Sequence, residues 1–251
     1  MPPRAAKPVG IVLVDKPAGP SSFAIVAELR RRTGARTGHA GTLDPLASGL
    51  LLLLSGAATK LAPCFVGLDK RYVTDVDLTA TTSTGDAEGA RSEPHGAPSR
   101  AELERRLGPL RGEIELPIPA ASAVKIGGER AYRLARRGTV VEMPLRRSHV
   151  DALDVITYSE PDEVGGGGVA RLELAVGSGT YVRAIATALG GHCLTLRRTA
   201  IGPFAVEEAD PQRLLSAAEA LARLPADAVA RVPEAVRGRV LALEADASVA
   251  G

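Results

Sequence analysis

The residue of this chain best suited to chemistry is Asp44, which lies in a run of small and rigid residues. Residues 38–48 have the sequence Gly-His-Ala-Gly-Thr-Leu-Asp-Pro-Leu-Ala-Ser. The glycines permit close backbone approaches, and Pro45 disfavours a helical conformation at Asp44. We therefore expect a stiff loop that presents the carboxylate, as many enzymes present a catalytic group. The alternative is ordinary turn chemistry, in which an aspartate side chain bonds its own backbone.

Five consecutive leucines follow this loop, at residues 50–54. An apolar run of this length without polar alternation is typical of a strand that is covered on both faces. The sequence therefore predicts that a buried strand anchors the loop that carries Asp44.

The remaining segments switch irregularly between strand and helix signals. Alternation of polar and apolar residues predicts strands, whereas serine caps, basic last turns and a proline at a first position predict helices. The predicted strands are residues 10–14, 50–54, 72–78, 149–157 and 169–176, and the predicted helices are one from Ser21 or Ser22 to Arg32 and others over residues 57–65, 99–107, 129–137, 181–189 and 211–224. Hairpins without a βαβ repeat favour an α+β fold with a largely antiparallel sheet.

Composition limits the class of protein. The 251 residues are 45% apolar, which is enough for a substantial core. The two cysteines form neither a disulfide framework nor a metal-ligand spacing, and they fit a reducing cytoplasm. No apolar stretch reaches membrane-spanning length. We expect no signal peptide, because the N-terminus lacks an apolar h-region followed by a cleavage site. We expect no cofactor, because no dinucleotide, phosphate-loop or clustered His/Cys motif occurs.

The net charge of +2 conceals blocks of opposite sign. Residues 1–71 carry ten Lys and Arg against four Asp and Glu, and residues 125–147 carry seven against two. The segments between and after these blocks are acidic. Two basic blocks separated by an acidic one suit a polyanionic partner, although arginine-rich helices also occur as plain solvated surfaces.

Six further motifs accompany residues 38–48 along the chain. They are Asp15-Lys16-Pro17, Asp69-Lys70-Arg71-Tyr72, Thr82-Ser83-Thr84-Gly85-Asp86, Arg130-Ala131-Tyr132 with Gly138, Gly179-Thr180-Tyr181-Val182-Arg183 and Leu196-Arg197-Arg198. In this order, the motifs resemble those of the TruB family of tRNA pseudouridine synthases. The resemblance runs from about residue 10 to about residue 204.

The resemblance implies an α+β pseudouridine synthase fold, in which helices flank a mixed, largely antiparallel sheet and the active cleft crosses its middle. It implies a catalytic domain over residues 1–224 with an RNA-clamping insertion at residues 120–145. Residues 225–251 would be a short C-terminal tail. The small PUA-type RNA-binding domain that bacterial relatives usually carry would then be missing or vestigial.

The implied activity is the isomerisation of uridine to pseudouridine in the TΨC loop of tRNA, at position 55, without a cofactor. Asp44 would be the nucleophile that acts on a flipped-out base. The T-arm of tRNA is the expected partner, and we expect a cytoplasmic monomer with no obligatory protein partner and no membrane association. The alternatives are a catalytically weak tRNA-folding chaperone or binding protein of the same fold, and a synthase of a guide-RNA ribonucleoprotein. A glycosidase-type carboxylate pair is disfavoured, because Asp44 is matched with an arginine.

The resemblance also assigns the catalytic roles. Arg183 pairs with Asp44 and keeps it ionised and aimed, and Asp86 shares this arginine. Tyr72 stacks on the flipped uracil and takes part in a late proton transfer. Judged from the residues alone, Arg183 is also compatible with a surface charge, Asp86 with a turn and Tyr72 with the core.

The substrate contacts follow from the same resemblance. His39 fills the space that the flipped nucleotide leaves, Lys16 supports the loop or a phosphate, and Tyr181 and Leu196 line the base pocket. The clamp contacts are mostly to phosphate and come from Lys125, Arg130, Tyr132, Arg133, Arg136 and Arg137.

Besides the missing PUA-type domain, two local features depart from the family pattern. Leu116 and Ala121 replace a glutamine and an aromatic residue that relatives usually have, which would remove part of the stacking on loop RNA. The link from Arg183 to Leu196 is several residues shorter than usual, which makes the placement of Leu196 less certain than that of Tyr72.

Overall fold

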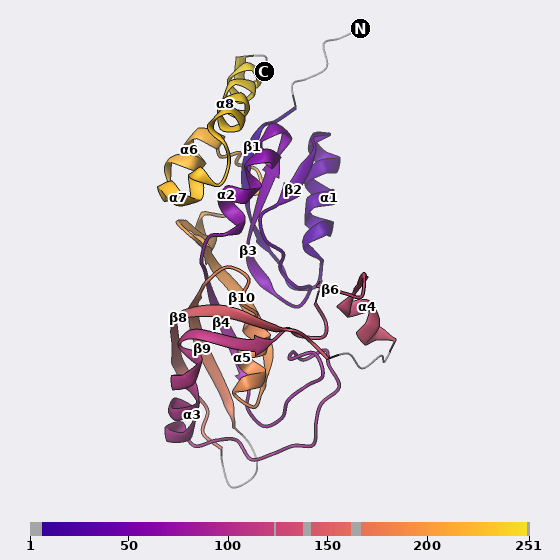
Figure 1. The fold of residues 1–251 in the computed structure, drawn as a ribbon, viewed down its shortest axis with the longest axis vertical. Helices are drawn as coiled ribbons and strands as arrows, with labels where there is room; N and C mark the ends of the chain where they lie inside the picture. The colour runs from indigo at the N-terminus through magenta and orange to yellow at the C-terminus, as the bar shows by residue number, and fades with distance from the viewer. Residues whose placement is uncertain (1–6, 123, 138–141, 162–166, 250–251) are drawn as a thin grey trace. The chain divides into compact units, whose positions relative to one another are not determined.

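The computed structural model describes residues 7–122, 124–137, 142–161 and 167–249. The chain forms two compact units, shown with their strands and helices in Figure 1. Unit 1 consists of residues 1–71 together with residues 197–251, and unit 2 consists of residues 72–196. The division into a catalytic domain over residues 1–224 and a tail stays a prediction.

Unit 1 is built on a sheet centred on β3 (Ser48–Ser55). The strand β1 (Gly10–Lys16) pairs antiparallel with it from Gly10↔Ser55 to Lys16↔Gly49. The other edge of β3 pairs with two strands. The end of β3 pairs with β2 (Thr37–His39), and the start of β3 pairs in parallel with β10 (His192–Ile201). A short strand, β11 (Phe204–Ala205), returns antiparallel along β10.

The leucine run is buried because helices cover both faces of this sheet. Leu51 and Leu53 pack with Val26 and Leu29 of α1 (Ser22–Thr33), whereas the alternate leucines of the run belong to a second cluster. That second cluster contains residues of α2 (Ala62–Val66), α6 (Ala217–Ala222), α7 (Ala226–Ala230) and α8 (Glu234–Val249). The predicted buried strand is therefore confirmed, and residues 226–249 pack as helices onto the core of unit 1.

Three helix predictions for unit 1 need comment. Ser21 caps α1 by accepting a hydrogen bond from the Ala24 backbone N–H, as predicted. Residues 57–65 form a 3₁₀ turn, η1 (Gly56–Leu61), followed by α2 rather than one helix. The predicted helix over residues 211–224 is wrong in its first half, because the Asp210 side chain holds a turn there and Ser216 caps a later start at Ala217. A further 3₁₀ turn, η3 (Val206–Glu208), follows β11.

Unit 2 contains a largely antiparallel sheet with the order β10, β4, β9, β8, β5. Its strands are β4 (Lys70–Asp77), β5 (Gly112–Pro117), β8 (Leu145–Tyr158), β9 (Val169–Val176) and the first half of β10, and its helices are α3 (Arg100–Leu107), η2 (Gly108–Leu110) and α5 (Val182–Ala188). In β4, Tyr72, Thr74 and Val76 face the interior as the alternation predicts. The two units confirm an α+β fold with a mixed, mostly antiparallel sheet.

The segment that follows β5 differs from the prediction. Lys125–Ile126 (β6) and Glu129–Arg130 (β7) form a two-stranded ribbon, and only Ala131–Arg136 (α4) is helical. Gly127 and Gly128 turn the ribbon with φ of 57° and 88°, the positive angles of a two-residue hairpin. Glu129 and Arg130 are therefore not part of the predicted helix over residues 129–137, and its end at Gly138 lies outside the described residues.

Across the described residues, no helix combines the length and apolarity that crossing a bilayer would require. Both cysteines, Cys64 and Cys193, are buried and are not joined in a disulfide.

Candidate active site

Asp44 lies half-buried on the loop between β2 and β3 of unit 1. Leu43, the residue before Asp44, is held by Ser22 in the first turn of α1, which bonds both polar groups of the Leu43 backbone. The Ser22 hydroxyl donates to the Leu43 carbonyl at 2.9 Å and accepts from the Leu43 N–H at 2.8 Å. On the other side of Asp44, the Pro45 carbonyl accepts from the Gly19 N–H at 2.7 Å. The loop is therefore tied down directly before and after the carboxylate, as the sequence predicts for a stiff loop.

Lys16, at the end of β1, is completely buried beneath this loop. Its ammonium group donates to the carbonyls of Pro17 at 2.8 Å, Pro20 at 2.9 Å and Pro45 at 3.3 Å. Burial lowers the pKa of Lys16, and the negative charge of Asp44 opposes that shift. These contacts favour the loop-supporting role of Lys16 over a contact to phosphate.

Arg198, on β10, is a second buried cation at the loop, with an exposed fraction of 1%. Its guanidinium donates to the carbonyls of Leu50 at 2.8 Å, Thr42 at 3.3 Å and Gly41 at 3.2 Å. Sequence reasoning gave Arg198 no role of its own, because it appeared only as the last residue of the Leu196-Arg197-Arg198 motif. The available signal was that Arg197 and Arg198 are adjacent, because successive side chains of a strand point to opposite faces of the sheet.

His39 ends β2, two residues before Gly41, and is half-buried. Its Nδ1 atom is buried and has no hydrogen-bond partner among the described residues. Burial lowers the pKa of His39, and the charge of Arg198 lowers it further. The ring is therefore held neutral near pH 7, which suits a residue that contacts a nucleotide without binding its phosphate.

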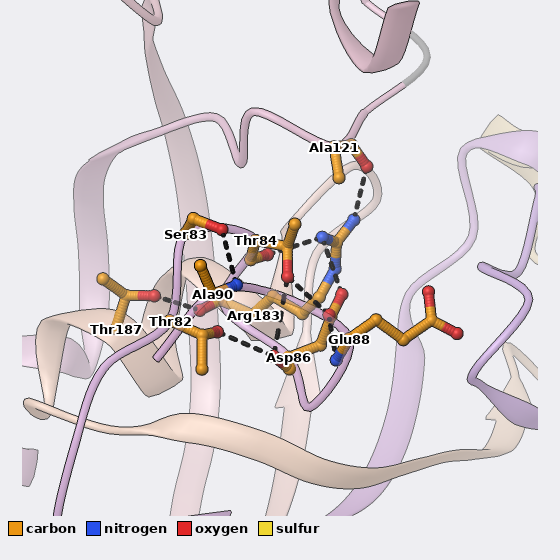
Figure 2. Close-up of polar contacts among 9 residues, drawn as sticks. All are labelled: Thr82, Ser83, Thr84, Asp86, Glu88, Ala90, Ala121, Arg183 and Thr187. Carbon is orange, nitrogen blue, oxygen red and sulfur yellow. Dashed lines mark hydrogen bonds and ion pairs between the residues drawn. The ribbon is translucent and has the colours of Figure 1, made fainter. Parts of the chain in front are cut away.

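In unit 2, Arg183 and Asp86 form a buried ion pair. Each has an exposed fraction of 3%, and Arg183 Nη1 lies 3.1 Å from Asp86 Oδ2 (Figure 2). The arginine also donates to the carbonyls of Thr84 at 2.7 Å and Ala121 at 2.9 Å. Burial excludes the alternative that Arg183 is a surface charge. The contact with Asp86 is as expected, whereas the sharing of this arginine with Asp44 stays a prediction.

Residues of the turn that carries Asp86 donate hydrogen bonds to its carboxylate. Oδ1 of Asp86 accepts hydrogen bonds from the Thr84 hydroxyl at 2.6 Å and from the Glu88 N–H at 3.1 Å. Backbone hydrogen bonds tie the turn to Cys193 at the start of β10, from Cys193 N–H to the Gly85 carbonyl and from Ala87 N–H to the Cys193 carbonyl. Asp86 is therefore both a turn residue and the partner of Arg183, and Figure 2 shows the network of its contacts.

The pocket residues of unit 2 lie on three elements. Tyr72 on β4 and Leu196 on β10 are buried. Tyr181, at the N-cap position of α5, is half-buried and lines an open depression together with Leu116 and Arg146. The short link noted in the sequence is a tight connection through Gly190 and Gly191, which leads from α5 directly into β10.

The basic residues of the predicted clamp lie on the ribbon and on α4. Lys125, Arg130, Arg133 and Arg137 are exposed. Arg137 is paired with Glu129 at 2.7 Å. The side chains of Tyr132 and Arg136 lie outside the described part of the chain.

The structure therefore brings the predicted residues together in two groups. His39, Lys16 and Asp44 gather at one loop of unit 1, and Arg183 and Asp86 are in contact within unit 2, which also holds Tyr72, Tyr181 and Leu196. Tethered carboxylates next to buried cations suit nucleophilic or acid–base chemistry. The catalytic roles of these residues stay predictions.

Residues 30–182, more than half of the chain, match the model of the TruB family pseudouridylate synthase (N terminal domain). The tRNA pseudouridine synthase B of Mycobacterium sp. (strain KMS) is 42% identical over 213 residues, which cover 80% of this chain and 70% of that protein. The enzyme of the same name from Dinoroseobacter shibae is 43% identical over 225 residues, covering 86% of this chain and 71% of that protein.

Among solved structures, the chain is similar to a protein of a Cbf5-Nop10-Gar1 complex, with a TM-score of 0.58 and 28% identity. The match covers 78% of this chain but only 50% of that one, so the chain spans about half of its solved relative. The family model covers the loop of Asp44 and the turn of Asp86. The chain belongs to the TruB family of pseudouridylate synthases.

Proposed function

We propose that this protein isomerises uridine to pseudouridine in tRNA, at position 55 of the TΨC loop, with Asp44 as the nucleophile. The observation that carries the proposal is the Asp44 loop, which matches the family motif and is held rigid by two buried cations. A carboxylate held in this way keeps its orientation without reorganisation during the reaction, which is the condition for efficient catalysis by a positioned group.

The reaction needs few groups. The C1′–N1 glycosidic bond breaks, the uracil turns, and a C1′–C5 bond forms, after which the C5 proton leaves and N1 is protonated. The bond that Asp44 makes to the nucleotide breaks again, so the carboxylate is regenerated and no group donor is consumed. Tyr72 is the proposed stacking partner of the flipped uracil, with Tyr181 and Leu196 as further walls of its pocket. Arg183, oriented by Asp86, supplies a fixed positive charge.

RNA binding is assigned to the exposed basic residues of the ribbon and α4. Lys125, Arg130 and Arg133 are exposed cations, which suits contacts to the phosphates of a folded T-arm. Arg136, Arg137 and Tyr132 complete the proposed clamp. The proposal implies a monomer that works on cytoplasmic tRNA without an obligatory protein partner.

The second candidate is a tRNA-folding chaperone or binding protein of the same fold. The fully buried Lys16 and the tied Asp44 loop favour the enzyme, because a binding surface has no need of a buried ammonium group beneath a loop. Both proteins would bind tRNA, so only the fate of the C5 hydrogen distinguishes them.

The test is the release of tritium from C5-labelled tRNA that lacks its own pseudouridine, followed by mapping of the product. Asp44→Asn should abolish release while tRNA affinity stays within about tenfold, because binding is spread over many phosphates. Asp227→Asn is the matched control, since this exposed carboxylate pairs with Arg231 in the same unit, and it should react like the unsubstituted protein. Near-normal release by Asp44→Asn would remove Asp44 from the nucleophile role, and no release by the unsubstituted protein would favour the chaperone.

A further inference from the structure

We propose that Arg198 is a positioning residue of this reaction, which fixes the backbone of the Asp44 loop from beneath with a buried charge. The inference deepens the proposed function and rests on it for the role of Asp44. Arg198 itself touches no part of the substrate in this proposal and acts through the loop.

The three hydrogen bonds of Arg198 span the loop. Its two terminal nitrogens hold Gly41 and Thr42, before Asp44, and its Nε atom holds Leu50, after it. Lys16 adds a contact to Pro45, the residue directly after the carboxylate. A side chain that bonds both arms of a loop prevents the arms from moving independently, so the guanidinium fixes the point from which Asp44 projects.

Gly49 makes this arrangement possible. Arg198 is in register with Gly49 across the β10–β3 pair, and a side chain at Gly49 would collide with the Arg198 backbone. Gly49 also has a φ of +103°, which favours glycine. At Gly41, a β-carbon would lie 3.8 Å from Arg198 Nη1, in ordinary contact with the guanidinium. The glycine at residue 49, directly after the motif, is therefore explained by the close approach of the strand that carries Arg198.

The charge of Arg198 is unusual for a structural residue. Among the described residues, its hydrogen bonds go to backbone carbonyls alone and no carboxylate lies within ion-pair distance. A buried cation without a counterion is costly, and apolar side chains usually serve stability better. Its field nevertheless reaches the site, because Arg198 contributes to the lowered pKa values of Lys16, His39 and Lys70. A positive centre at this place suits an anionic nucleophile above it.

The experiment compares Arg198→Lys and Arg198→Met with the unsubstituted protein. The methionine removes the charge and all three hydrogen bonds, and the lysine keeps the charge but loses the planar fork. We expect kcat of tritium release to fall at least about tenfold in both variants with KM changed less than about threefold, because a small displacement of the reacting group slows chemistry more than it weakens RNA binding.

Arg223→Met is the control in the same unit, since Arg223 also bonds a carbonyl and an acidic side chain. It should lower Tm without lowering kcat.

A second readout separates charge from packing and does not depend on activity. In an NMR titration, Arg198→Met should raise the pKa of His39 towards its usual value, because the nearby positive charge is gone, whereas Arg198→Lys should leave it low. If both variants lose only Tm, as Arg223→Met does, Arg198 is a packing residue and the inference is wrong. A similar His39 titration in both variants would also contradict it. Absence of tritium release from the unsubstituted protein would instead reject the proposed function, and the His39 titration would still test the loop.

Discussion

Asp86 and Arg183 are joined at 3.1 Å with both side chains almost wholly withdrawn from solvent. The pair links three segments of unit 2, because Arg183 on α5 also bonds the carbonyls of Thr84 and Ala121. Ala121 lies just before the ribbon of the predicted clamp. The arginine assigned to catalysis is therefore also the group that ties the entry of this ribbon to the turn of Asp86.

Substituting Asp86 should be much more damaging than substituting an exposed partner of arginine. Asp86→Asn removes the negative charge from a buried ion pair with Arg183, so the free energy of unfolding should fall by about 3–5 kcal/mol. Glu102→Gln, which breaks solvent-screened pairs with Arg105 and Arg106 on α3, should cost far less. Urea unfolding of the three proteins measures both losses. Equal losses would show that burial does not set the strength of the Asp86 pair.

Ser122 offers the opposite case, a buried hydroxyl without a partner. Its exposed fraction is 4%, and its Oγ atom makes no hydrogen bond to any residue that the structure describes. Ser122→Ala should therefore leave Tm unchanged or raise it, because an unsatisfied polar group is removed. Ser55, equally buried, donates to the Pro8 carbonyl at 2.9 Å, and Ser55→Ala should lower stability by about 1–2 kcal/mol. A larger loss from Ser122→Ala than from Ser55→Ala would mean that Ser122 has a partner in solution.

Lys70 should make stability depend on pH in the alkaline range. Its ammonium group is buried and donates to the Val66 carbonyl at 2.7 Å and to the Leu68 carbonyl. Burial, aided by Arg198, lowers the pKa of Lys70 from 10.5 to about 8. Between these values the unfolded chain binds more protons than the native protein, so this residue raises stability with pH from about 8 to about 10.5, by up to about 3 kcal/mol.

The measurement for Lys70 is urea unfolding from pH 7.5 to 10, compared between the unsubstituted protein and Lys70→Met. The difference between their stabilities should change steadily above pH 8 and be constant below it. Lys60→Met, at an exposed lysine of the same unit, should show a constant difference throughout. Parallel curves for Lys70→Met would contradict the lowered pKa.

The clamp prediction concerns salt. Replacing Arg133, Arg136 and Arg137 by Gln should reduce the slope of log K against log salt by roughly two units, because each lost phosphate contact accounts for about 0.7–0.9. It should raise KM more than it lowers kcat. The control replaces Arg100, Arg105 and Arg106 of α3, which are already paired with Glu102 and Glu104, and should leave the slope unchanged. Equal slopes for both triple variants would make Arg133, Arg136 and Arg137 an ordinary solvated surface.

Much of the fold follows from local patterns. The leucine run, the alternation of β4 and the serine caps at Ser21 and Ser99 predict elements that the structure confirms. The ribbon was missed because four strand residues carry no period, although the paired glycines between them signal a hairpin. The helix predicted from Pro211 failed because the Asp210 turn competes with a proline start.

Site residues could be predicted where they lie in a motif of the family. They could not be predicted where their role depends on burial in the folded protein. Asp86 and Arg183 could be paired in advance, since both lie in motifs of the family. Arg198 could not be assigned, because an arginine in a strand normally faces solvent and only the packing of β10 against β3 buries it. The same holds for Ser122, whose lack of a partner depends on the surrounding backbone.

The core of unit 1 joins the leucines of β3 to Phe204 and Val240, so it cannot close until residue 240 has left the ribosome. Unit 2 is one continuous stretch and is free to condense earlier. Residues 72–196 connect the two segments of unit 1, so the folding of unit 2 shortens the flexible loop between those segments. A shorter loop lowers the entropic cost of bringing the two segments together. During synthesis, the most apolar strand of the protein therefore waits longest for its partners. Newly made chains should be most prone to aggregate in that interval, and a chaperone that shields β3 should raise their yield.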